Sequence, residues 1–146
     1  RTPVMALEPT DRIERHFNSP ENREAARGML AVYSTYLAPP ASPNRRATGL
    51  ALYERGEIGL MMAWDRAAAT AELGAEGPDL YAAMHDYLVD TRNRDFRDAA
   101  QADLLQGGVF LAVGAFHLPG RNGLIALLQE DGYTVTRLPL PSEVQP

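Results

Sequence analysis

Apolar residues in the middle of the chain recur at the spacing of an amphipathic helix. Leu80, Met84 and Leu88 are each four residues apart, which places them on one helical face. This pattern predicts a long helix over about 78–105. Shorter helical patterns precede it, and they run from Thr10 to Phe17, from Pro20 to before Pro39, and over about 44–54 and 57–73.

Three apolar runs lack helical spacing and are interpreted as strands. Val109–Gly114 is continuously apolar, as in strands buried on both faces of a parallel sheet. A helix at about 122–131 and a strand at Thr134–Leu138 follow it, an order that predicts a right-handed β-α-β unit. Val4–Leu7 is expected to be a further strand. The expected fold class is therefore α/β and helix-rich, with a partly parallel sheet and a middle helical region.

Composition excludes several kinds of chemistry. The 146-residue chain has no cysteine, so disulfides and thiolate metal ligands are ruled out. Its 14 basic residues are all arginine, which excludes Schiff-base and P-loop lysines. A formal net charge of -5 argues against a dedicated nucleic-acid binder. No apolar run is long enough for a transmembrane helix.

Two candidate functional residues follow predicted strands. Ligands of open parallel sheets bind beyond the carboxyl ends of the strands, and Glu8 directly follows Val4–Leu7. His117 lies three residues after Gly114, where a glycine lets the backbone turn without a Cβ clash. If these strands are neighbours, Glu8 and His117 share one crevice. A carboxylate beside an imidazole can form a metal-ligand pair, an acid–base pair or a structural hydrogen bond.

Arg92 is a third candidate, because it continues the four-residue spacing of the long helix and is expected to face inward. A buried guanidinium needs a partner, and Glu8 is a suitable one. The alternative is that the helix drifts and Arg92 extends to water. The neighbouring Asn93 can cap or hydrogen-bond a loop. His85 lies away from the apolar stripe and is expected to be exposed.

Four segments together form a recognisable set. Residues 109–120 read Val-Phe-Leu-Ala-Val-Gly-Ala-Phe-His-Leu-Pro-Gly, and residues 132–135 read Gly-Tyr-Thr-Val. Arg92-Asn93 precedes them, and Ala6-Leu7-Glu8 ends the first apolar run. The set resembles the signature of the TraB/GumN family, which includes the Tiki metalloproteases and is related in fold to haem-binding ChaN and the erythromycin esterases. Two residues depart from it: Ala6 stands where the family usually has glycine, and Phe116 where a small residue is common.

The resemblance implies a role for each candidate residue. His117 corresponds to the histidine of a Gly-x-x-His motif that begins at Gly114, and it would be a divalent-metal ligand with Gly114 beside the cofactor. Glu8 corresponds to a strand-end glutamate that acts as a metal ligand or general base. Arg92 and Asn93 correspond to an Arg-Asn pair that orients Glu8 or stabilises an oxyanion.

The resemblance also implies how the chain is organised. Residues 1–138 are expected to be the C-terminal part of one domain, with an earlier Gly-x-x-His motif missing upstream, and residues 139–146 a proline-rich tail. The missing N-terminal segment or a second copy of the chain is therefore an expected partner. By resemblance, the protein is periplasmic, exported or membrane-associated.

Three functions are compatible with these residues. The first is a metal-dependent hydrolase that acts on amide bonds of a peptide or small molecule and uses Mn²⁺, Co²⁺ or Zn²⁺ held by His117 and Glu8. The second is a non-enzymatic protein that binds haem or another ligand, or has a regulatory role. The third is a metal-free, esterase-like hydrolase in which His117 and Glu8 are the acid and base.

Overall fold

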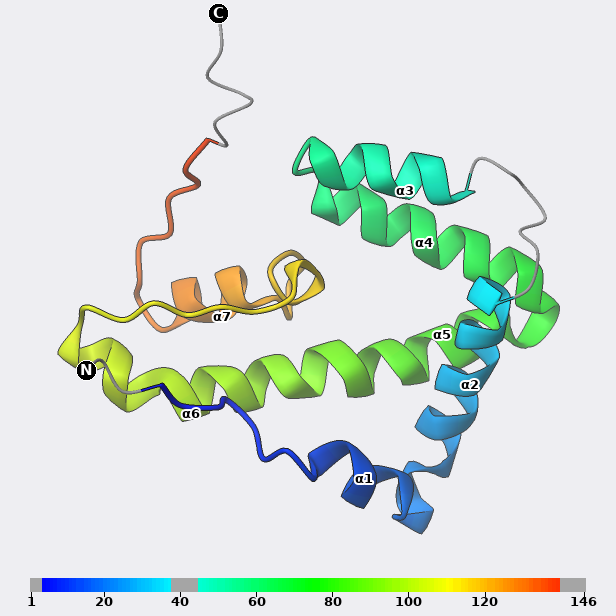
Figure 1. Cartoon of the computed structure of the whole chain (residues 1–146), viewed down its shortest axis with the longest axis horizontal. Coiled ribbons are helices and arrows are strands. Elements are labelled where there is room, and N and C mark those ends of the chain that lie inside the picture. The colour runs from blue at the N-terminus through cyan, green and yellow to red at the C-terminus, as the bar shows by residue number, and fades with distance from the viewer. Residues whose placement is uncertain (1–3, 38–44, 140–146) are drawn as a thin grey trace, which may run out of the picture.

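The computed structural model describes residues 4–37 and 45–139, and most of them are helical (Figure 1). The α-helices in chain order are α1 (Arg12–Phe17), α2 (Arg23–Leu37), α3 (Arg45–Glu54), α4 (Ile58–Leu73), α5 (Gly77–His85), α6 (Arg92–Gln106) and α7 (Leu124–Glu130). Short 3₁₀ turns lie at η1 (Pro20–Asn22), η2 (Gly74–Glu76) and η4 (Ala115–His117), and a π-helical segment forms η3 (Asp86–Thr91). The helices predicted over the first two thirds of the chain are confirmed.

Helices α5 and α6 form one long helix that is joined through η3 and crosses the molecule (Figure 1). Its first turn contains Pro78, whose missing N–H is not needed there. It ends at Gly107, where φ is +80°, a conformation that glycine adopts without steric cost. The predicted helix at 78–105 therefore has nearly the expected ends.

The π-helical segment η3 changes which residues face inward. A π-helix adds a residue to the turn, so the step between the buried residues Met84 and Val89 is five positions. The buried positions of the long helix include Leu80, Met84, Val89, Asn93, Phe96 and Ala100. Asn93, with 0% exposure, therefore takes the deepest position, and its neighbour Arg92 is only partly buried.

The main core lies where α2 and α4 pack against α5. Val32, Ala69, Tyr81 and Met84 form its buried centre. Gly28 lets α2 approach α5 closely, because a Cβ at this position would overlap the backbone carbonyl oxygen of Leu80. This crossing holds the N-terminal half of the long helix in place.

The predicted sheet and β-α-β unit are wrong for residues 4–37 and 45–139, which contain no strand. Val4–Leu7, Val109–Gly114 and Thr134–Leu138 are coil, and the last two flank α7 in the sequence (Figure 1). Phe110 is 92% exposed and Leu138 is 80% exposed. An apolar run becomes a buried strand only if neighbouring strands accept its backbone hydrogen bonds and other elements cover its faces. Neither condition is met by the described residues.

Most of the expected tail at 139–146 lies outside the described residues. Within the described ranges, no helix has the length and apolar character needed to cross a bilayer.

Candidate functional site

Glu8 lies just before α1, and its carboxylate contacts two arginines from different elements. Arg92 of α6 donates from Nε to Glu8 Oε2 over 3.0 Å and from Nη2 to Oε1. Such two-point contacts are the strongest form of arginine–carboxylate pairing. Arg12 of α1 donates from Nη1 to Glu8 Oε2 over 3.1 Å. The structure thus pairs Arg92 with Glu8, as the sequence predicts.

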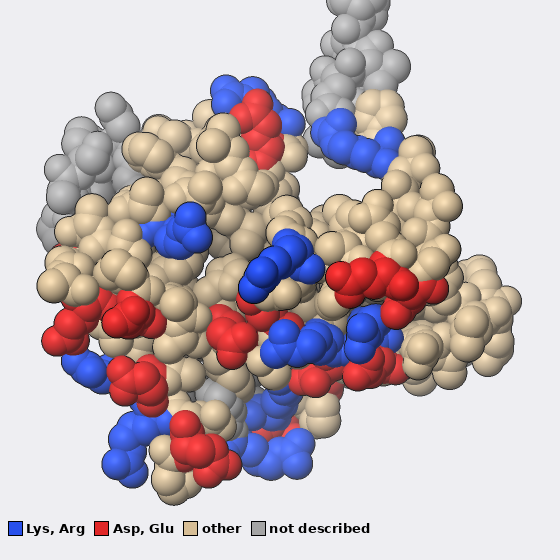
Figure 2. All heavy atoms as spheres, turned by 180° about the vertical axis from the view of Figure 1, so that it is seen from behind, with Lys and Arg blue, Asp and Glu red and all other residues tan. Residues whose placement is uncertain are grey.

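The two arginines connect this pair to α6 and to η3. Arg12 Nη2 donates to Asp95 Oδ2 over 2.6 Å, and Arg92 Nη1 donates to the Leu88 carbonyl oxygen over 3.1 Å. The Arg92 guanidinium also lies 5.1 Å from the centre of the Phe96 ring, within the range of a cation–π contact. The coil before α1 is therefore fixed to α6 by charge. On the face drawn in Figure 2, acidic and basic side chains are mixed together rather than separated by sign.

The arginines also determine the charge of Glu8. Burial alone would raise the pKa of Glu8, but the hydrogen bonds and positive charges of Arg92 and Arg12 outweigh it and hold the pKa below 4.5. Glu8 is therefore an anion at neutral pH. Because both of its oxygens already accept hydrogen bonds from guanidinium groups, it is poorly disposed to act as a general base.

Asn93 and His117 form the buried part of the site. Asn93 Nδ2 donates to the Asn122 carbonyl oxygen over 2.7 Å, and Asn93 Oδ1 lies 2.7 Å from His117 Nδ1. A carbonyl oxygen can only accept, so the amide nitrogen of Asn93 must face Asn122 and the amide oxygen must face His117. That oxygen also only accepts, and His117 Nδ1 therefore carries the proton.

This tautomer leaves the lone pair of neutral His117 on Nε2. Nε2 has no hydrogen-bond partner among the described residues. It is not completely buried, so solvent can reach it. Burial lowers the pKa of His117 below 6.5, and the nearby positive charge of Arg92 lowers it further. His117 is therefore neutral at pH 7, with one nitrogen fixed and the other able to accept a proton or a ligand.

A second layer of polar residues, which sequence reasoning missed, supports this pair. Asn122 Nδ2 donates to Asp90 Oδ2 over 2.8 Å, and His85 Nδ1 lies 3.5 Å from Asp90 Oδ1. His85 is partly buried rather than exposed, so its expected exposure is wrong. Residues five apart face each other here because η3 is π-helical. The signal in the sequence is the apolar spacing of Val89 and Phe96, which is out of phase with Leu80 and Met84.

Gly114 positions the turn that carries His117 without special backbone geometry. Its φ is −62°, which any residue adopts. A Cβ at this position would lie 3.6 Å from His117 Cδ2, an ordinary contact distance. The neighbouring Gly123 is more restricted, because a Cβ there would overlap the carbonyl oxygens of Leu118 and Pro119.

The side chains fit a divalent metal only in part. His117 suits such an ion, because metal-bound histidines usually donate their other ring N–H to a fixed acceptor. Glu8 suits it less, since two guanidinium groups occupy its oxygens. Within residues 4–37 and 45–139, no three potential ligands of the histidine, cysteine, aspartate or glutamate type gather at one point. A complete metal site would need ligands beyond those that these residues bring together.

The comparisons with known proteins agree with the sequence signature. A model described as the TraB/PrgY/gumN family matches residues 3–137. The chain belongs to the TraB/PrgY/gumN family. Glu8, Arg92, Asn93 and His117 all lie within the matched residues of the family domain. Neither the curated proteins nor the solved structures contain a match to the chain.

Proposed function

We propose that this TraB/PrgY/gumN family chain is a hydrolase of amide or ester bonds in which His117 is the general base. The observation that carries the proposal is the 2.7 Å contact between Asn93 and His117, because it fixes the Nδ1–H tautomer. Neutral His117 then has Nε2 free to accept a proton. A neutral imidazole whose ring is oriented by a hydrogen bond and whose pKa is lowered is a common form of general base in enzymes.

In this proposal a water molecule attacks the substrate carbonyl carbon while His117 Nε2 takes its proton. The protonated His117 then gives that proton to the departing nitrogen or oxygen, so that the histidine ends neutral. Asn93 takes no proton and acts as a positioning residue. Its amide oxygen holds the ring orientation and favours the imidazolium that forms during the step.

Arg92 is suited to stabilise the negative oxygen that develops on the substrate. A guanidinium has five N–H groups, and three of those of Arg92 are used by Glu8 and the Leu88 carbonyl, which leaves two. The Arg92 charge acts on His117 strongly enough to lower its pKa. Glu8 anchors the guanidinium, so its role in this proposal is to orient Arg92 for the oxyanion.

A metal-dependent hydrolase is the second candidate. The observation that favours it is the same hydrogen bond, since an Nδ1–H held by an acceptor leaves Nε2 ready to bind Mn²⁺, Co²⁺ or Zn²⁺. Such an ion would lower the pKa of a bound water. His117 would be one of its ligands, and the others would come from outside the group described above.

Hydrolysis of chromogenic esters and anilides by the wild type and by His117→Gln tests both candidates. Glutamine can still donate a hydrogen bond to Asn93, but it cannot accept a proton. We expect His117→Gln to lower the rate by about 10²–10⁴-fold, while Leu30→Asp, an exposed change on α2 outside the site, stays close to the wild type. Thermal melting of each variant separates a loss of chemistry from a loss of folding.

The metal dependence of the reaction decides between the two candidates. Turnover that is unchanged by EDTA supports His117 as a general base. Turnover that EDTA abolishes and Mn²⁺, Co²⁺ or Zn²⁺ restores supports the metal-dependent hydrolase instead. If His117→Gln turns over every substrate at the wild-type rate, the hydrolase proposal is wrong in both forms.

A further inference from the structure

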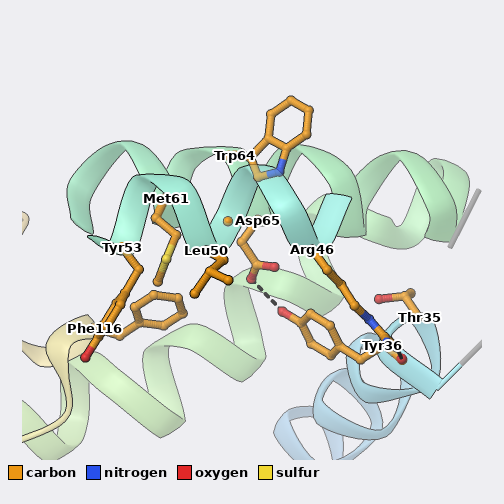
Figure 3. A pocket seen from close by; sticks show the side chains of 10 residues that line it. Thr35, Tyr36, Arg46, Leu50, Tyr53, Met61, Trp64, Asp65 and Phe116 are labelled. Atoms are coloured by element: carbon orange, nitrogen blue, oxygen red, sulfur yellow. Dashed lines mark hydrogen bonds between the residues drawn. The ribbon is translucent and has the colours of Figure 1, made fainter. Parts of the chain in front are cut away.

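An apolar pocket borders the η4 turn that carries His117. It has a volume of about 470 Å³, which lies within the usual range for small-molecule sites. Helices α2, α3 and α4 form most of its wall, and Phe116 of η4 completes it. Figure 3 shows Leu50, Met61 and Phe116 pointing toward one another, with Tyr53 beside Phe116, while the ring of Trp64 points away from them.

Several polar groups of the pocket contact one another. The Tyr36 hydroxyl donates to Asp65 Oδ2 over 2.6 Å, the contact drawn in Figure 3. Tyr81 donates to the same oxygen over 3.3 Å, and Arg46 donates to the Tyr36 carbonyl oxygen over 2.8 Å. Most of the other lining side chains are apolar, so an uncharged apolar group gives up no hydrogen bonds to water when it enters the pocket, whereas a charged group loses its hydration.

Phe116 connects this pocket to the candidate site. Its side chain lies at the end of the pocket with Tyr53 and Met61 (Figure 3), while the side chain of the next residue, His117, contacts Asn93. Adjacent α-carbons are about 3.8 Å apart. The pocket and the candidate site therefore meet at the η4 turn, which carries a side chain of each.

We propose that this pocket binds an aromatic or branched aliphatic side chain of a peptide-like substrate, next to the bond whose hydrolysis His117 assists as general base. The inference rests on the proposed function and adds a substrate class to it. Phe116 sets the depth of the pocket, because its ring closes the end beside Tyr53 and Met61. The pocket thus selects substrates by apolar side chain, and the His117 site supplies the chemistry.

Trp64 makes the binding directly measurable. It is the chain's single tryptophan, it lines the pocket and it is 39% exposed, so its fluorescence reports on the pocket without a label. The probes are the N-acetyl amides of phenylalanine, leucine, glycine and glutamate. We expect a saturable change with phenylalanine and leucine amides at affinities at least about tenfold higher than with glycine amide, since burial of one apolar side chain is worth about that factor. Glutamate amide should produce no saturable change.

A matched pair of surface variants tests whether the probes bind in this pocket. Leu50→Asp places a carboxylate on the pocket wall, and Leu50 is exposed enough, at 58%, to be replaced without loss of folding. It should weaken phenylalanine amide binding at least about tenfold. Leu30→Asp makes the same change at a residue that is 68% exposed on α2 and outside the pocket lining, so it should bind like the wild type. Equal binding by both variants overturns the assignment, as does a wild type that shows no saturable response to any apolar amide.

Turnover of the corresponding p-nitroanilides separates this inference from the proposed function. Faster cleavage of phenylalanine and leucine substrates than of the glycine substrate supports both. Binding of phenylalanine amide without turnover of its anilide supports the ligand class of the pocket and overturns the hydrolase. Turnover that depends on His117 but is the same for all side chains supports the hydrolase and overturns the pocket.

Discussion

The two halves of the long helix are fixed by different kinds of interaction. The α5 half packs through apolar contacts at the α2 crossing, with Tyr81 and Met84 in the core. The α6 half adds directed polar contacts to its apolar packing against α7, from Arg92 to Glu8 and from Asn93 to His117 and Asn122. Apolar packing depends on shape and volume, whereas each polar contact depends on a donor and an acceptor in a fixed place.

This difference indicates where the chain has kept groups that stability does not require. A fully buried polar side chain gains little net stability over an apolar one of the same shape, but it is costly when a partner is lost. Asn93 is 0% exposed and uses both ends of its amide. The α5 half could not accept such a residue without a matching network. The α6 half is therefore the part of the helix in which chemistry, and not packing alone, selects the residues.

The largest expected effect comes from breaking the apolar half. Gly28→Ala places a Cβ against the Leu80 carbonyl oxygen. Neither the Cβ nor the carbonyl can rotate away, so α2 and α5 must move apart. We expect a loss at the upper end of about 1–3 kcal/mol in the free energy of unfolding, measured by urea denaturation. The His117 tautomer, read from its ring ¹⁵N shifts, should not change.

Gly49→Ala is the matched control for this substitution. Gly49 lies inside α3, and a Cβ added there would meet no atom within 4 Å, so alanine should stabilise the protein by about 0.5–1 kcal/mol. If the two alanine variants have equal stability, close packing between α2 and α5 does not hold this half together.

A smaller loss of stability is expected from Asn93→Leu in the polar half, but with a different signature. Leucine has a similar size and leaves both the Asn122 carbonyl oxygen and His117 Nδ1–H without their partner. We expect a loss of about 2 kcal/mol, again from urea denaturation. The ¹⁵N shifts should change from a pure Nδ1–H tautomer to a mixture of both, and hydrolysis should fall. A variant that keeps the Nδ1–H tautomer would show that Asn93 does not set it.

The helices could be predicted from the sequence because their signals are local. Spacing of apolar residues, Pro78 in a first turn and Gly107 at an end depend on neighbours within a few positions. The strand predictions failed because the run at Val109–Gly114 forms a strand only if distant segments pair with it. The residues of the run alone do not determine such pairing, and the described residues do not provide it.

The contacts among the candidate residues were predictable only in part. Glu8 and Arg92 were expected to pair, and they do. The pairing of His117 with Asn93 rather than with Glu8 could not be predicted, because the π-helical turn η3 shifts the inward face by one position. A pattern with constant four-residue spacing points to Arg92, and one extra residue in the turn brings Asn93 inward instead.

The smallest expected effect is a pH dependence that belongs to the polar half alone. Burial lowers the pKa of His117 below 6.5, so above that pH the folded and unfolded chains both hold it neutral. As the pH falls below 6.5, the unfolded chain takes up a proton at this histidine that the folded chain does not, and the free energy of unfolding decreases by at most about 1.4 kcal/mol per pH unit.

Glu8 gives a second pH dependence at lower pH. Its pKa is held below 4.5 by Arg92 and Arg12 despite its burial, so the stability that ionised Glu8 contributes is present above pH 4.5 and is lost as the pH falls through the pKa of the folded state. In urea titrations, His117→Gln should remove the decrease just below pH 6.5 and Glu8→Gln the one below pH 4.5. Gly28→Ala should lower stability equally at every pH, because it changes no titrating group, and a His117→Gln profile that matches the wild type would place the acid sensitivity outside this site.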